Sequence, residues 1–187
     1  RVTVTAGSVA GAITVTAATT GLANLTFSLQ SRLPGPSITA ASFANWASNE
    51  AGVTPGGLVL ISGAGLAPST QGSTNANLLA GKLPYELAGV TVEFQFSGTS
   101  AFAPIYRVSN INGGETVLAQ VPFEVTGTTV NVVVNVSGGT TTVTGIPVRA
   151  VSPGVIEDFI NGRQAAVVIR SDGLAVTPTT PARRGEL

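Results

Sequence analysis

The chain has 187 residues, of which 43% are hydrophobic and only 10% are charged. A chain of this length can bury a core as one large or two small domains, and globular domains usually carry about 25% charged residues. Thr, Ser, Asn, Gln and Gly must therefore cover most of the surface, which is unlike a helical bundle or a coiled coil. The formal net charge is zero, and only Arg183 and Arg184 cluster among the nine basic residues, so the sequence excludes a phosphate-neutralising nucleic-acid surface.

Histidine, cysteine and methionine are absent from the sequence. Disulfides, thiolate metal sites and thiol catalysis are therefore excluded, and the common nucleophile–base arrangements lack their imidazole. No serine lies in a Gly-x-Ser-x-Gly elbow, and no calcium-loop motif is present. Glu157 and Asp158 are neighbours on one predicted strand, so their side chains point to opposite faces. We expect a protein with no enzymatic activity, no cofactor and no metal site.

Residues 1–31 place apolar side chains at every second position of several short runs, with threonine and serine between them. This pattern predicts two or three β-strands of a partial Ig-like domain. The apolar positions, which we expect to act as assembly strands, are Val2, Val4, Ile13, Val15, Leu25, Phe27 and Leu29. Residues 32–37 follow with two prolines, which disfavour regular strand pairing, and we expect them to form a linker.

Residues 38–153 are expected to form the main sandwich, because short runs rich in β-branched residues recur between turn signals. Gly138-Gly139 predicts a hairpin, and the continuous apolar run 58–61 predicts a strand that is buried on both faces. Helical turns are expected only near residues 40–47 and 75–80. The residues predicted to form the core between two sheets are Leu58, Leu60, Val90, Val92, Phe94, Phe96, Val130, Val132, Val134 and Val136.

Residues 154–187 combine a predicted hairpin with a polar, proline-rich tail. Asn161-Gly162 is a strong hairpin signal between two apolar runs, and Asp172-Gly173 marks a second turn. This block is too small to bury a core alone, so we expect it to be part of a second domain. The fold class predicted for the chain is all-β: an Ig-like β-sandwich flanked by a strand block at each end.

Three residues are candidates for modification or ligand contact. Asn24 and Asn135 each begin an Asn-x-Ser/Thr glycosylation pattern, and alternation turns both side chains toward solvent. Trp46 is the only tryptophan and lies in a polar stretch. It is either a plug at the base of the core or a ring on which a sugar stacks, and a lone tryptophan favours the plug.

Several stretches carry a family resemblance. Residues 38–43, 83–92, 119–124 and 181–186 resemble an uncharacterised C-terminal domain family of acidobacterial exported proteins. Pro55–Leu66 and Pro147–Val155 resemble the opening and closing strands of IPT/TIG domains, an Ig-like class, and residues 1–31 resemble the last strands of a preceding bacterial Ig-like domain. The resemblance implies an exported, often multidomain architecture, and it implies no activity and no functional residues.

The two strand blocks predict what the chain does. A two-stranded unit is marginally stable in water, so we expect neighbours to complete residues 1–31 and 154–187. Those neighbours are either other copies of the chain, joined into a homopolymer by β-strand complementation, or tandem Ig-like domains of a longer chain. The leading interpretation is a structural filament or stalk subunit that is secreted or displayed on the cell surface. The alternative is a carbohydrate- or partner-binding module of a larger secreted protein. We expect no membrane span, because no apolar run approaches the roughly 20 residues that a bilayer requires.

Overall fold

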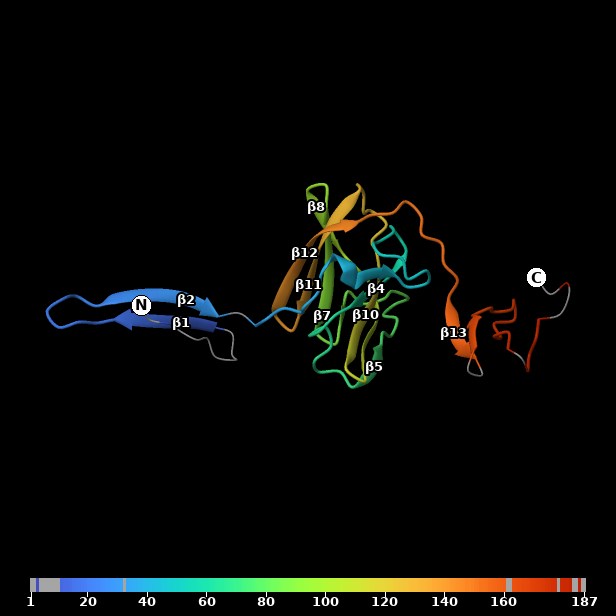
Figure 1. Ribbon diagram of the computed structural model, residues 1–187, viewed down its shortest axis with the longest axis horizontal. Coiled ribbons are helices and arrows are strands. Elements are labelled where there is room, and N and C mark those ends of the chain that lie inside the picture. The colour runs from blue at the N-terminus through green and yellow to red at the C-terminus, as the bar shows by residue number, and fades with distance from the viewer. Residues whose placement is uncertain are drawn as a thin grey trace.

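The computed structural model describes residues 3, 11–31, 33–160, 163–177, 179–182 and 185. Two antiparallel sheets pack face to face at its centre, and a two-stranded sheet projects from each end (Figure 1). The only helical element among the described residues is a 3-10 turn, η1 (Ala40–Ser42). The all-β fold class and the central sandwich are therefore confirmed.

Each sheet of the sandwich is antiparallel. The first sheet has, in spatial order, β3 (Phe43–Asn45), β4 (Leu58–Ser62), β10 (Gly114–Gln120), β9 (Ile105–Ile111) and β5 (Gly72–Asn75). The second sheet has, in spatial order, β12 (Gly139–Pro147), β11 (Thr129–Val136) and β7 (Val90–Phe96). The other edge of β7 pairs with two short strands in succession, β6 (Glu86–Leu87) and β8 (Thr99–Phe102).

The core lies between the two sheets and follows the alternation of the sequence. All four predicted residues of β7 and all four of β11 are buried. The prediction for β4 was wrong in its register: Val59 and Ile61 are buried, whereas Leu58 and Leu60 lie half-buried on the other face. The partner sheet covers only one face of this antiparallel sheet, so a continuous apolar run does not require burial on both sides.

Two-residue turns with the same backbone close several hairpins of the sandwich. At the β11–β12 turn, Ser137 and Gly138 both have positive φ, 50° and 95°, because a two-residue turn that matches the strand twist requires this backbone. The predicted hairpin is confirmed, with its turn one residue earlier than Gly138-Gly139. The same backbone recurs at Ser97-Gly98 and Asn112-Gly113. The helical turn expected near residues 75–80 was wrong, since Asn75 ends β5 and a bridge between Leu79 and Lys82 follows.

The flanking sheets are hairpins. At the N-terminal end, β1 (Gly11–Ala17) pairs with β2 (Leu25–Ser31), and we call residues 11–31 the N-terminal arm. At the other end, β13 (Glu157–Ile160) pairs with β14 (Arg163–Ala166), with two residues between them, as expected for a hairpin there. We call residues 155–160 and 163–177 the C-terminal arm. Val2, Val4, Asn161, Gly162, Arg183 and Arg184 lie outside the described residues.

Candidate functional site

The N-terminal arm is an amphipathic ribbon. Directly opposed residues of an antiparallel pair share a face, and the register pairs Ile13 with Leu29, Val15 with Phe27 and Ala17 with Leu25. These six side chains form one face of the ribbon, which we call the apolar ribbon face. Leu25, Phe27 and Leu29 are 59%, 48% and 46% exposed, while Ile13 and Val15 are half-buried. The opposite face carries mainly threonine, serine and glutamine.

Nothing in the sequence protects this ribbon against association. Residues 2–31 contain no charged side chain, and residues 11–31 contain no proline. Exposed strands in soluble proteins are usually guarded by lysine, proline or a bulge, because their free backbone groups and apolar faces recruit other strands. Among the described residues, β1 and β2 pair only with each other. The apolar ribbon face therefore has the character of a contact surface.

The C-terminal arm also leaves apolar side chains in solvent. Beyond β14 the chain folds back on itself, with Val176 N–H donating to the Val168 oxygen and Arg170 N–H donating to the Leu174 oxygen. This confirms the turn predicted at Asp172-Gly173. Among the residues of the arm whose burial is described, the exposed large hydrophobic ones are Val155, Ile156, Val167, Val168, Ile169 and Leu174.

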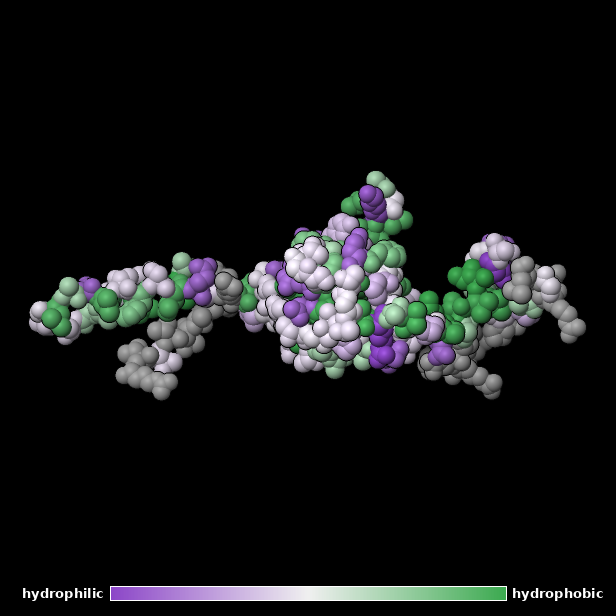
Figure 2. Space-filling model, turned by 90° about the horizontal axis from the view of Figure 1, so that it is seen from above, coloured by the Kyte–Doolittle hydropathy of each residue, from purple (hydrophilic) through white to green (hydrophobic). Residues whose placement is uncertain are grey.

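The two arms leave the sandwich at opposite ends and point away from each other (Figure 1). Figure 2 shows hydrophobic residues along the N-terminal arm and a cluster of them on the C-terminal arm, whereas the sandwich between them presents mainly polar or neutral residues. The sandwich separates the described parts of the two arms, so neither arm covers the apolar side chains of the other.

Residues 33–37, which connect the N-terminal arm to the sandwich and lie within the expected linker, are docked against β12. Pro34 bridges Thr140 in parallel at the start of β12, and the Thr141 hydroxyl donates to the Pro36 oxygen at 2.6 Å. A Cβ on Gly35 would lie 2.4 Å from the Thr140 carbonyl carbon, so only glycine allows this approach. Proline has no N–H to donate, but its carbonyl oxygen can still accept a hydrogen bond. Proline is therefore tolerated at the edge of a sheet, where its missing N–H faces away from the neighbouring strand.

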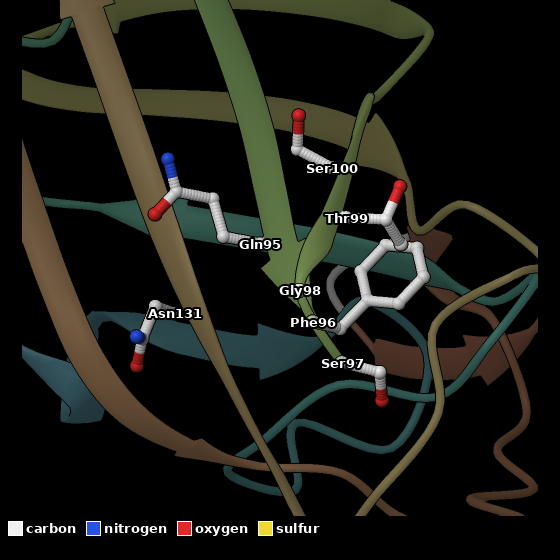
Figure 3. A pocket seen from close by; sticks show the side chains of 7 residues that line it. All are labelled: Gln95, Phe96, Ser97, Gly98, Thr99, Ser100 and Asn131. Carbon is white, nitrogen blue, oxygen red and sulfur yellow. The ribbon is translucent and has the colours of Figure 1, made fainter.

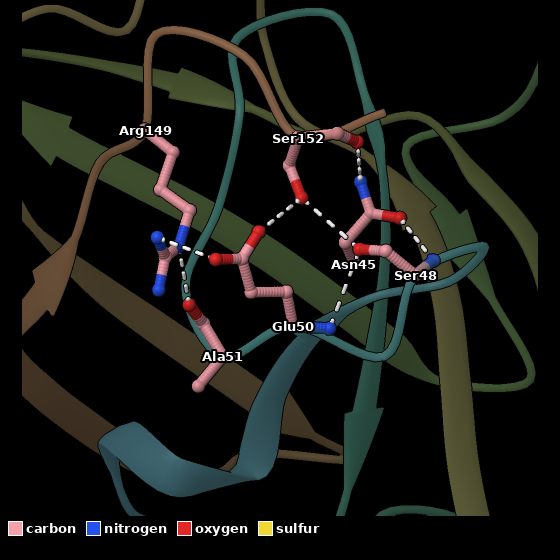
Figure 4. Close-up of polar contacts among 6 residues, drawn as sticks. All are labelled: Asn45, Ser48, Glu50, Ala51, Arg149 and Ser152. Atoms are coloured by element: carbon pink, nitrogen blue, oxygen red, sulfur yellow. Dashed lines mark hydrogen bonds and ion pairs between the residues drawn. The ribbon is translucent and has the colours of Figure 1, made fainter. Parts of the chain in front are cut away.

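The root of the C-terminal arm is held by a polar cluster (Figure 4). The Glu50 carboxylate accepts a hydrogen bond from the Ser152 hydroxyl at 2.9 Å and forms an ion pair with Arg149 at 2.7 Å. Arg149 Nε donates to the Ala51 oxygen at 2.8 Å, and the Asn45 amide donates to the Ser152 oxygen at 3.2 Å. The ion pair is about half exposed and contributes at most about 1 kcal/mol to stability. Residues 149–152 are therefore held by all of these contacts together and not by the ion pair alone.

The strand β12 connects the two places where the arms join the sandwich. β12 begins beside Pro34 and Pro36, and the chain runs from its end at Pro147 directly into the clamped residues 148–152. Val53 N–H also donates to the Pro147 oxygen, which joins the end of β12 to the loop between β3 and β4 of the other sheet. Both arms are therefore anchored at β12, the N-terminal arm beside its start and the C-terminal arm beyond its end.

The predicted modification and stacking residues lie apart from one another. Asn24 is exposed beside β2. Asn135 is half-buried, and its amide binds Thr140 and the Gly138 N–H within the β11–β12 turn. Trp46 is half-buried in the turn after β3, and the choice between a plug and a stacking ring stays a prediction. Glycosylation at Asn24 and Asn135 stays a prediction.

Two depressions lie on the sandwich itself. One, of about 460 Å³, has Gln95, Ser100 and Asn131 on its wall, and the three side chains come from adjacent strands β7, β8 and β11 (Figure 3). The other, of about 320 Å³, is lined by the aromatic residues Tyr85, Phe102 and Phe123. The sequence did not reveal either site, because the pairing of β8 with β7 decides which of its side chains face outward. Trp46 lines neither depression.

The described residues show no arrangement for metal chemistry, since no three His, Cys, Asp or Glu side chains gather there. Glu157 lies exposed on β13. Within the same part of the chain, no helix is long and apolar enough to cross a membrane.

Comparisons with protein-family models, curated proteins and solved structures give no match for this chain. The resemblance to acidobacterial exported domains and to IPT/TIG domains therefore stays a prediction. The function has to be inferred from the arms and from the outer face of the sandwich.

Proposed function

We propose that this protein is a non-enzymatic structural module, joined end to end to its neighbours through its two β arms. One observation carries the proposal: each end of the sandwich bears an arm with apolar side chains in solvent, on β2 at one end and on the residues before β13 and after β14 at the other. Exposed hydrophobic patches on soluble proteins mark contact surfaces, and strand addition is a common way to cover them.

The contact that covers both arms at once is head to tail. The apolar ribbon face of one copy packs on the apolar side chains of the C-terminal arm of the next, and strand edges pair where they meet. Such a contact is heterologous, so it repeats without closing and builds a filament or stalk. The zero net charge lowers the electrostatic cost of stacking copies. The resemblance to exported bacterial domains supports a secreted or cell-surface location.

The absence of cysteine allows a direct test by cross-linking. A Leu25→Cys chain is mixed with a Leu174→Cys chain, and a short thiol-to-thiol cross-linker is added. Both positions are exposed and lie on the proposed contact. We expect cross-linked dimers that contain one chain of each kind, as read by mass spectrometry.

The matched control is Thr26→Cys, which lies on the same strand as Leu25 and on the opposite face. Its cross-linking to Leu174→Cys should be much weaker. Leu25→Cys chains that cross-link only with each other would overturn the head-to-tail contact. Chains that do not cross-link in any combination would overturn self-assembly, and the arms would then be completed by other domains.

A further inference from the structure

The outer face of β7 and β8 carries a surface that the assembly contact does not use. Gln95 pairs with Asn131 on β11 and with Ser100 on β8, so these three side chains form one polar row across three strands. All three are exposed, and Figure 3 shows them at the first depression. The row carries amides and a hydroxyl and no charge.

An aromatic cluster continues from this row. Ser100 and Phe102 lie on the same face of β8, about 7 Å apart along the strand, and Phe102 pairs with Glu93 on β7. Phe102 also lines the second depression together with Tyr85 and Phe123. The two depressions are therefore neighbours joined by one strand, and we call the combined surface the β8 face.

The three rings are held in solvent against the usual preference of aromatic side chains. Phe123, Tyr85 and Phe102 are 74%, 57% and 49% exposed, in a chain that has only ten aromatic residues. The Phe123 ring lies over Gly56, where a Cβ would clash with it. Exposed rings gathered at one depression are typical of a ligand site.

The polar groups of the β8 face limit the chemistry of the ligand. Gln120 and Glu124 lie on the aromatic depression, Glu93 lies between the two, and no lysine or arginine lines either one. Carboxylates without a cation repel phosphate, sulfate and carboxylate groups. Amides, carboxylates and hydroxyls bind hydroxyl groups, and flat rings pack on the C–H faces of a sugar.

We propose that the β8 face binds a neutral glycan. Sugar rings stack on Phe102, Tyr85 and Phe123, and the row Gln95, Ser100 and Asn131 binds the hydroxyl groups of the next residues of the glycan. The strand spacing fits an extended chain rather than a single sugar, because the polar row and the aromatic cluster follow each other along β8. A structural module with this face adheres to polysaccharide along its length.

The test is a glycan array with neutral, sulfated and sialylated members, probed with the intact chain and with variants. We expect binding to be confined to neutral glycans and to fall about tenfold or more in Phe102→Ala and in Gln95→Ala. Phe102→Tyr should keep the binding, because it keeps the ring. The matched control is Tyr106→Ala, which removes an exposed ring outside both depressions and should leave binding unchanged.

Three outcomes would overturn the proposal: no binding to any neutral glycan, binding to acidic glycans only, or binding that Phe102→Ala does not change. A loss of self-association in Phe102→Ala would assign the face to a protein contact and overturn it as well. The cross-linking experiment tests the arms and the glycan array tests the β8 face. Either proposal can therefore fail while the other stands.

Discussion

At the scale of single residues, the alternation along β11 separates side chains that hold the sandwich together from those that do not. Val132 is fully buried opposite Phe94, whereas its neighbour Val133 is half-buried on the outer face. Val132→Ala should lower the free energy of unfolding by about 2–4 kcal/mol, because it leaves a cavity between two sheets. Val133→Ala should cost much less, and urea unfolding of the two variants measures the difference. Equal losses of unfolding free energy in the two variants would contradict the assignment of Val132 to the inner face and Val133 to the outer face of β11.

The residues of β7 and β11 were predictable because period-two alternation is a local property of a half-buried strand. Leu58 and Leu60 were not, since a continuous apolar run does not say which of its faces meets the partner sheet. Tyr85, Phe102 and Phe123 were missed for a different reason. They lie on three separate segments, and only the tertiary arrangement brings them to one depression.

At the scale of elements, the segment at residues 33–37 shows how a proline-rich stretch can dock on a strand. Gly35→Ala should lower the free energy of unfolding by about 1–3 kcal/mol, because its Cβ would clash with the Thr140 backbone. The matched control is Gly11→Ala, where a Cβ meets nothing within 4 Å. Urea unfolding and hydrogen exchange at the β12 edge measure the effect. A neutral Gly35→Ala would show that the segment is not held against β12.

The hairpins were largely predictable, because Gly after a small residue at a turn specifies backbone with positive φ. The pairing of β13 with β14 agrees with the hairpin expected there, and the turn at Asp172-Gly173 places Gly173 at positive φ. The docking of Pro34 and Pro36 was not predictable, because proline is disfavoured in paired strands and the exception depends on the edge that is offered.

At the scale of the whole molecule, a β-sandwich lies between two arms that expose apolar side chains. The order of blocks along the chain was visible in the sequence, whereas the direction of the arms was not. Their departure from opposite ends follows from the docking of residues 33–37 at the start of β12 and of residues 148–152 beyond its end. This geometry is the one that the proposed head-to-tail contact requires.

Sedimentation velocity of the intact chain tests self-assembly through the arms most directly. The comparison is a shortened chain that begins at Leu33, which lacks the N-terminal arm and keeps the docked segment. We predict that the intact chain forms species whose size grows with concentration, while the shortened chain stays a folded monomer. An intact chain that sediments as a monomer at every concentration would contradict the account.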